Sequence, residues 1–135
     1  RKHAYLDNLL QLADVLVSPR IDNAVTRGGF VSQMPEYMAS GRPIVATPVS
    51  GCRFLLRDGA GILVEPGDDA ALAAGLERAL ALGPEARLQM VARARANVER
   101  FTWREGIGPA VSVLRRLVEP ARDAASPAGA AEAGR

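Results

Sequence analysis

The chain has 135 residues, of which 48% are apolar and 24% charged, and its formal net charge is +2. This length suits one modest domain, and a charge so near neutral argues against a nucleic-acid partner. Cys52 is the only cysteine, which excludes an intrachain disulfide and a cysteine-based metal site. There is no signal peptide and no apolar run long enough to span a bilayer, so we expect a cytoplasmic protein.

The first third of the chain mixes helical and strand-like patterns. Apolar residues recur at helical spacing over residues 4–13 and predict an amphipathic helix. A short, buried, parallel strand is expected over residues 14–18, followed by a polar loop over residues 19–29. The next helix should run from about Val31 to Ser40 and end at Gly41, ahead of a second strand over residues 44–46.

The middle of the chain continues this alternation. We expect a short helix over residues 52–57 and a third strand over residues 61–64. Asp68 is placed to cap a helix over residues 69–82, and Gly83-Pro84 separates it from another over residues 85–100. The stripes expected to face the core are Leu72, Leu76, Ala79 and Leu80 on the first helix, and Leu88, Val91, Val98 and Phe101 on or just after the second. The pattern predicts an α/β fold, part of a doubly wound parallel sheet.

A last helix is expected to open at Thr102–Glu105, which fits a capping box. Gly106, Gly108 and Pro109 should kink this helix or delay its start to Pro109. Its apolar face would carry Ile107, Val111, Leu114 and Val118. Residues 120–135 are rich in Ala, Pro and Gly and should be disordered. We therefore expect a domain over residues 1–119 and a disordered tail over residues 120–135.

The segment from strand to loop to helix at residues 14–40 is a candidate anion site, because backbone N–H groups at a helix start are unpaired. Gly28 and Gly29 permit close approach of the backbone to a ligand. Arg20 and Arg27 flank the loop and could pair with phosphate oxygens, although loop arginines of this kind are more often solvated. Thr47 ends a strand on the ligand side of the sheet, where it could also be a turn residue.

Glu36 is the strongest single candidate for a binding role. A carboxylate in the helix after the loop can accept two hydrogen bonds from ribose hydroxyls, as the acidic residue of dinucleotide folds does. The alternative is a solvated glutamate on a helix. We reject His3, the only histidine, as a base because no Ser, Cys or Asp constellation accompanies it, and we expect Cys52 to be a small buried residue.

Four segments in order resemble retaining GT-B glycosyltransferases of family 4, or group 1, over about Tyr5–Leu117. Gly29-Phe30 with residues 35–47 is similar to the donor-nucleotide segment of that family. The other similar segments are Ala13–Pro19, Gly61–Asp68 and Phe101–Trp103. The family pattern E-x7-E places its second Glu at Glu36 and its first at Gly28, where this chain has no carboxylate. A lysine usual in one branch of the family is replaced by Gln33.

The resemblance implies the C-terminal, Rossmann-like half of the GT-B fold. It implies transfer of a sugar from a nucleotide-diphosphate-sugar to an acceptor hydroxyl with retention, without a metal or other cofactor. Glu36 would bind the ribose. The backbone amides of Gly29, Phe30, Val31 and Ser32 would face the sugar and the diphosphate, and Ser32 and Gln33 could add side-chain donors. We name no catalytic residue, because the basic clamp and the acceptor-domain residues fall outside this segment.

Only three strands are predicted, so we expect the opening βαβ units and the N-terminal acceptor domain to be missing and the chain alone to be inactive. One alternative is a non-catalytic, degenerate GT-B module that binds a nucleotide or a partner, which the departures at Gly28 and Gln33 favour. Another is a different GT-B enzyme such as a sugar-nucleotide epimerase, against which the spacing from Gly29-Phe30 to Glu36 argues. The arginines of residues 87–100 predict a solvated helix face, with peripheral contact to a membrane surface as the alternative.

Overall fold

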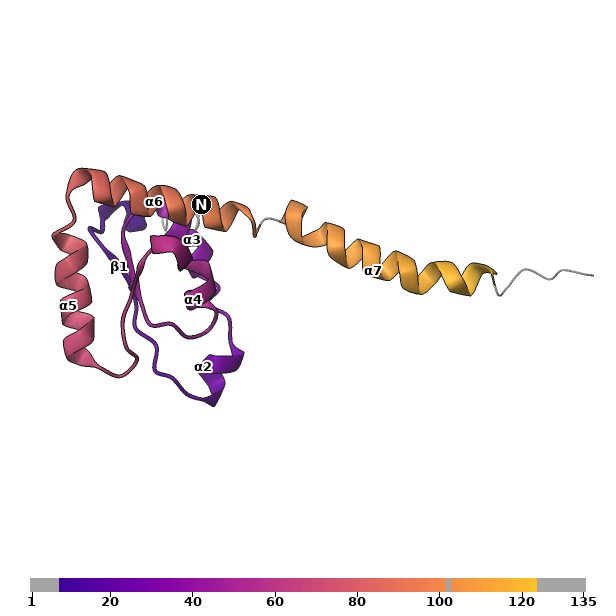
Figure 1. Ribbon diagram of the computed structural model, residues 1–135, viewed down its shortest axis with the longest axis horizontal. Coiled ribbons are helices and arrows are strands. Elements are labelled where there is room, and N and C mark those ends of the chain that lie inside the picture. Colours follow the sequence, from indigo (N-terminus) through magenta and orange to yellow (C-terminus); the bar gives the residue numbers. More distant parts are fainter. Residues whose placement is uncertain (1–7, 102, 124–135) are drawn as a thin grey trace, which may run out of the picture. The chain divides into compact units, whose positions relative to one another are not determined.

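The computed structural model describes residues 8–101 and 103–123, which belong to two compact units, Arg1–Arg100 and Phe101–Arg135. The expected boundary after residue 119, between a domain and a disordered tail, stays a prediction. Within the first unit a helical segment at residues 8–12 precedes a parallel sheet surrounded by helices (Figure 1). Its elements are β1 (Leu16–Ser18), α2 (Ala24–Gly28), α3 (Met34–Ser40), β2 (Ile44–Ala46), α4 (Cys52–Leu55), a 3-10 turn (Arg57–Gly59), β3 (Ile62–Leu63), α5 (Asp69–Leu80) and α6 (Pro84–Glu99).

The sheet has the strand order β1-β2-β3, and both pairings are parallel, as predicted. Val17 pairs with Val45, which in turn pairs with Ile62. All three residues of the central strand β2 are buried. A parallel strand covered on both faces is expected to be apolar throughout, and Ile44–Ala46 meets this condition.

Side chains of β2 alternate between two apolar clusters on opposite faces of the sheet, as the period of a strand requires. Ile44 and Ala46 belong to one cluster, together with Met34 and Met38 of α3 and residues of α4. Val45 belongs to the other, with Ala79 of α5. Helices therefore cover both faces of the sheet, with α5 on one side and α3 and α4 on the other (Figure 1).

Gly75 lets α5 approach the sheet closely. A methyl group built on Gly75 would lie 2.5 Å from Cγ1 of Val64 and 3.2 Å from Cγ1 of Val45. The first distance is well below van der Waals contact, so no larger residue fits unless the helix moves. Asp68 begins this helix as predicted, its carboxylate accepting a hydrogen bond from the Ala71 amide at 2.8 Å.

Two predictions about residues 19–40 were wrong. The helix expected from Val31 begins at Met34 instead, because residues 32–33 form a turn in which the Met34 amide bonds to the Val31 carbonyl at 3.0 Å. The segment 19–29, predicted as a polar loop, contains the short helix α2. Asn23 caps this helix by accepting hydrogen bonds from two amides, and the Thr26 hydroxyl accepts one from the Asn23 amide.

The predicted apolar stripes of α5 and α6 were partly wrong. Leu80 is 57% exposed and Leu88 is 69% exposed, and Phe101 is also exposed. The small residues Gly75 and Ala79 are the buried positions of α5, and Ala94 and Asn97 those of α6. These helices thus approach their neighbours through small or polar residues, which turns some of the larger side chains outward.

The second unit is built on α7 (Trp103–Asp123), which is continuous through Gly108 and Pro109, so its start is not delayed to Pro109. Its end lies four residues inside the tail that was expected to be disordered. The predicted cap residue Thr102 and residues 124–135 lie outside the described part of the chain. The described side chains of the expected apolar face, from Ile107 to Val118, are exposed. Within residues 8–101 and 103–123, no helix has both the length and the apolar character needed to cross a bilayer.

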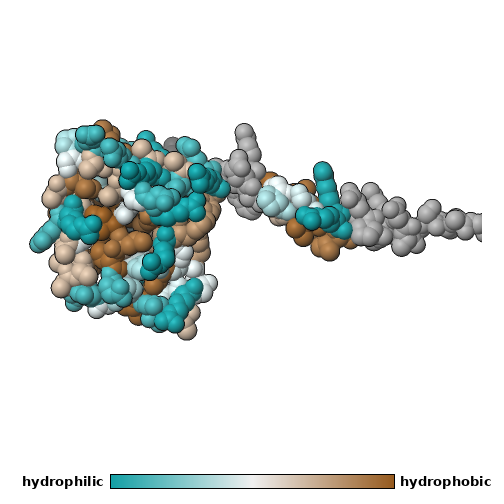
Figure 2. Space-filling view, in the orientation of Figure 1, coloured by the Kyte–Doolittle hydropathy of each residue, from teal (hydrophilic) through white to brown (hydrophobic). Residues whose placement is uncertain are grey.

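Both edge strands of the sheet, β1 and β3, lack an outer strand partner among the described residues, and the β1 edge lies beside apolar surface. β1 pairs only with β2 among the described residues, so its outer side has no strand partner there. Figure 2 shows apolar atoms gathered in the middle of one face of the first unit, in the region where Figure 1 labels β1. An unpaired edge beside apolar surface is a position at which a further strand can add.

Candidate functional site

The carboxyl ends of the three parallel strands meet at one edge of the sheet, which is where ligands bind in doubly wound folds. Pro19 follows β1, Thr47 follows β2 and Val64 follows β3, and these three residues line a cavity of about 110 Å³. Its rim also carries Glu65 and Asp68. Carboxylates repel a diphosphate, so this small cavity is a poor place for the phosphates of a nucleotide.

Thr47 acts as a structural link at this edge, which favours the turn interpretation over a ligand role. Its hydroxyl donates a hydrogen bond to the Arg20 carbonyl at 2.7 Å and accepts one from the Arg20 amide at 3.0 Å. The side chain is buried, and both bonds join the segment after β2 to the segment after β1. The hydroxyl is therefore already engaged within the protein.

The predicted donor loop packs against the turn that follows β2. A methyl group built on Gly51 would lie 3.7 Å from Cδ2 of Phe30, so the Phe30 ring covers that glycine. The buried Ser50 hydroxyl donates a hydrogen bond to the Thr26 carbonyl of α2. Ser50 has a φ of 53° and Gly51 a φ of 82°, so the turn is left-handed at both positions. Sequence reasoning missed Ser50, although its place after the strand and before a glycine was visible.

The start of α3 carries the other predicted donor-binding residues. Val31 is buried in the apolar cluster and anchors the loop, while Ser32 and Gln33 are exposed beside it. The Gln33 side chain makes no capping hydrogen bond. The backbone carbonyl of Gln33 accepts a hydrogen bond from the Tyr37 amide. The Ser32 and Gln33 side chains are thus displayed on the surface by an anchored turn, which is compatible with the predicted role.

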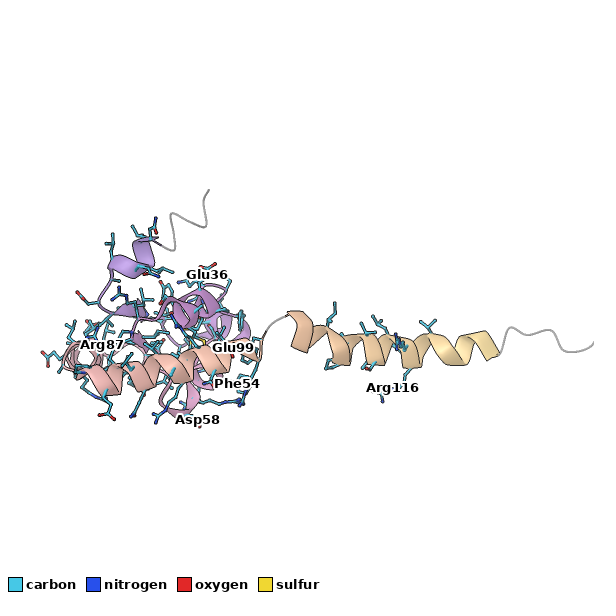
Figure 3. All side chains as sticks on the ribbon, turned by 90° about the horizontal axis from the view of Figure 1, so that it is seen from above. Glu36, Phe54, Asp58, Arg87, Glu99 and Arg116 are labelled. Atoms are coloured by element: carbon cyan, nitrogen blue, oxygen red, sulfur yellow. The ribbon has the colours of Figure 1, made fainter. Side chains whose placement is uncertain are left out.

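Glu36 is exposed on α3, within its first turn (Figure 3). It lines a cavity of about 340 Å³ together with Leu10 and Gln11 of the N-terminal helical segment and Ala39 and Ser40 of its own helix. No residue of Gly28–Gln33 lines this cavity, so the structure does not bring the predicted ribose ligand and the predicted phosphate loop into one pocket. The carboxylate remains accessible to a ligand that reaches over α3.

The two loop arginines differ in their surroundings. Arg27 forms an exposed ion pair with Asp22, with Nε 2.7 Å from Oδ1, so it is already partnered. Hydrogen bonding to Arg27 lowers the pKa of the Asp22 carboxyl below its ordinary value. The Arg20 side chain is exposed and has no ion pair with a described residue. Arg20 is thus the better candidate for contact with a phosphate.

Gly28, where the family pattern has its first glutamate, ends α2 at an exposed position. A methyl group built on it would meet no atom within 4 Å apart from its chain neighbours and its own helix backbone. Packing therefore does not force glycine at this position, and a larger side chain would fit there. No group of three or more His, Cys, Asp or Glu side chains in the described part of the chain is arranged to hold a metal ion.

Cys52 is fully buried in the apolar cluster, as predicted, at the start of α4. Burial raises the pKa of its thiol above the ordinary value, and the charge of Arg20 offsets this only in part. We expect a maleimide to leave Cys52 unmodified in the native protein near neutral pH and to label it once urea unfolds the chain. Rapid labelling of the native protein at the rate of a free thiol would contradict this buried, protonated state.

The chain matches the family model described as glycosyl transferases group 1 over residues 2–82, which is more than half of its length. It is 38% identical over 95 residues to a phosphatidyl-myo-inositol mannosyltransferase of Mycobacterium leprae, covering 70% of this chain and 24% of that protein. It is 40% identical over 73 residues to the putative glycosyltransferase EpsD of Bacillus subtilis, covering 53% of this chain and 18% of that one. The chain thus spans a quarter or less of the length of these relatives.

Solved structures agree on the fold. A sucrose-phosphate synthase from Thermosynechococcus elongatus superposes with a TM-score of 0.68 and 31% identity, covering 88% of this chain and 29% of that structure. A glycosyltransferase from Rickettsia africae superposes with a TM-score of 0.70 and 21% identity, covering 82% and 29%. The predicted α/β fold with a parallel sheet of the GT-B type is confirmed.

Proposed function

Because the chain belongs to the group 1 glycosyl transferases, we propose that it forms the donor-binding, C-terminal part of an enzyme that transfers a sugar from a nucleotide-diphosphate-sugar to an acceptor hydroxyl with retention. The observation that carries this proposal is the family match over residues 2–82, which includes all three strands, the Gly29–Gln33 loop and α3. In this proposal the rest of the enzyme supplies an N-terminal acceptor domain, and further strands extend the sheet at the open edge of β1.

The Gly29–Gln33 loop, Arg20 and Glu36 each have a role in this proposal. The loop from Gly29 to Ser32 presents its amides to the sugar and the diphosphate, and Gln33 and Arg20 add side-chain donors. Glu36 accepts hydrogen bonds from the ribose hydroxyls. Amides held in place by the buried Val31 are pre-organised, so they stabilise charge on the leaving diphosphate without rearrangement. We assign no metal ion, no other cofactor and no nucleic-acid partner to this reaction.

The chemical nature of the acceptor determines whether the enzyme must work at a membrane surface. The mycobacterial relative is named for a phosphatidyl lipid, phosphatidyl-myo-inositol. We propose a cytoplasmic enzyme that contacts a membrane surface peripherally when its acceptor is lipid-linked. The arginines of α6 are the candidates for this contact, since basic side chains are attracted to anionic lipids.

The second candidate function is a non-catalytic module that binds a nucleotide or a partner. The observation that favours it is Gly28, which leaves the loop without the carboxylate of the family pattern although the position has room for one. A non-catalytic module of this kind could bind the donor nucleotide as the enzyme does, but it would not transfer the sugar. Restoring a carboxylate by Gly28→Glu without loss of donor binding would show that the loop tolerates the family residue.

Donor binding is tested by substituting Glu36 in the full-length protein that carries this segment. Glu36→Ala should weaken nucleotide-sugar binding roughly ten- to hundredfold, because hydrogen bonds to a charged group contribute about 1.5–3 kcal/mol. Glu36→Gln, which keeps an acceptor but loses the charge, should have a smaller effect. The effect should shrink for a donor analogue that lacks both ribose hydroxyls. The measurement is isothermal titration calorimetry with the intact and deoxy donors.

Glu99→Ala is the matched control, because Glu99 is likewise an exposed glutamate on a helix but belongs to α6 and lines none of the described cavities (Figure 3). It should bind the donor as the unmodified protein does. Equal weakening of the intact and deoxy donors by Glu36→Ala would show that Glu36 is not a ribose ligand. Donor binding with no sugar transfer in the full-length protein would favour the non-catalytic module.

A further inference from the structure

A third cavity, lined by two arginines, lies on the first unit beside β3. It has a volume of about 320 Å³ and lies between β3, the second half of α5 and the first two-thirds of α6. The residues of interest among its lining are Gly59, Gly61, Leu63, Arg78, Gln89 and Arg93. Like β1, β3 is an edge strand of the sheet, so the backbone on its outer side has no strand partner in the described chain. The volume is at the lower end of the range for small-molecule sites.

The exposed Arg93 side chain lies against the turn before β3. A methyl group built on Gly59 would lie 2.7 Å from Nη1 of Arg93, so the guanidinium occupies the space that a side chain would fill. Gly59 has a φ of 76°, a conformation that favours glycine. The turn that contains Asp58, labelled in Figure 3, thus seats this arginine beside β3.

The cavity carries an excess of positive charge. Arg78 reaches it from α5 and Arg93 from α6, and neither forms an ion pair or a side-chain hydrogen bond with a described residue. Gln89 adds an amide, whose Nε2 donates to Glu85 at 3.4 Å, a long hydrogen bond that a better acceptor can replace. The residues that line the cavity include two cationic side chains and no carboxylate, which leaves an attractive field for an anion.

We propose that this cavity binds a small anion carrying two or more phosphoryl groups, at a site separate from the proposed donor loop. Two guanidinium groups from different helices match the spread of charge on a diphosphate, since guanidinium forks bind phosphate oxygens in pairs. The cavity shares no residue with the Gly29–Gln33 loop or with the cavity at Glu36. It includes the residues that precede β3, whereas the doubly wound fold binds its substrate at the carboxyl ends of the strands.

The test is titration of the purified protein with inorganic pyrophosphate by calorimetry. Arg78→Gln and Arg93→Gln should each weaken the affinity about tenfold, and the double variant more, while the lysine variants should retain more affinity because they keep the charge. Arg100→Gln, directly after α6 and outside the cavity, should change it less than twofold. Amide NMR shifts of Gly59 and Gly61 on titration provide a readout that does not depend on a variant.

The absence of saturable pyrophosphate binding would overturn the proposal, as would equal losses from Arg100→Gln. Losses from Arg20→Gln alone would assign the anion to the donor loop and also overturn it. The ligand could be the headgroup of a lipid or a soluble compound, and sedimentation with vesicles of cardiolipin, which carries two phosphates, distinguishes these two sources. Vesicle binding that depends on Arg78 and Arg93 and is displaced by pyrophosphate identifies a lipid headgroup, and pyrophosphate binding without vesicle binding identifies a soluble phosphate compound.

Discussion

Met34→Ala is expected to lower the free energy of unfolding by about 2–5 kcal/mol, the range for truncating a fully buried methionine. Met34 has no exposed surface and belongs to the apolar cluster between α3, α4 and the sheet. It is also the first residue of α3, directly after the Ser32–Gln33 turn. The cavity left by the missing side chain should therefore loosen the anchoring of the predicted donor loop as well as the core.

The measurement is urea unfolding followed by circular dichroism, in which the midpoint should fall while the slope stays unchanged. Val25→Ala is the matched control, because Val25 is an apolar residue of the short helix α2 that is 83% exposed. It should change the free energy of unfolding by less than about 0.5 kcal/mol. Equal effects of the two substitutions would show that Met34 does not lie in a packed core.

The parallel sheet was predictable because its signals are local. The apolar run Ile44–Ala46 after a proline predicted β2 with its observed bounds, and Asp68 before a helical pattern predicted the cap of α5. The family resemblance, read from four loose motifs in order, is confirmed by the family match over residues 2–82. Patterns of this kind depend only on neighbours in the sequence, so one chain is enough to read them.

The features that escaped prediction depend on partners distant in the sequence or on small residues. The hydrogen bond from Ser50 to Thr26 joins segments 24 residues apart and could not be read from either one. Leu88 fits a helical apolar stripe, yet α6 packs through Ala94 instead, because a small side chain allows closer approach. The short helix α2 was visible in principle, since Asn23 and Thr26 form a capping pair inside the polar loop.

The roles of the candidate site residues stay predictions, and the geometry separates them. The Phe30 ring lies against the turn at Gly51, while Glu36 faces a different cavity beside Leu10. The sequence predicted that both residues contact one ligand, because the sequence of the loop and helix does not reveal on which side of α3 Glu36 lies relative to the loop. A nucleotide that contacts both must therefore extend from the loop across the start of α3.

Asn97→Asp is expected to lower the free energy of unfolding at pH 7 by about 3–5 kcal/mol, the cost of an uncompensated buried charge. Asn97 is buried on α6, and its Nδ2 donates hydrogen bonds to the carbonyls of Leu55 at 3.1 Å and Arg57 at 3.2 Å. The substitution has nearly the same shape but replaces this donor with a carboxylate oxygen that faces two carbonyl oxygens. It should release α6 from the turn that follows α4.

The same geometry predicts the pH dependence of this variant. The two carbonyl oxygens favour the protonated carboxyl, so its pKa in the folded state lies above the unfolded value of about 3.9. The protonated group is least destabilising below that unfolded pKa, and stability is lost as the pH rises through the folded pKa. Urea unfolding of the variant and the unmodified protein at pH 4 and pH 7 should therefore show a larger difference in the free energy of unfolding at pH 7.

Asn23→Asp is the matched control, because Asn23 acts through Oδ1 as an acceptor at 2.9 and 3.0 Å and a carboxylate preserves that role. If the two substitutions had equal effects at pH 7, the buried amide of Asn97 would not be the donor that joins these helices.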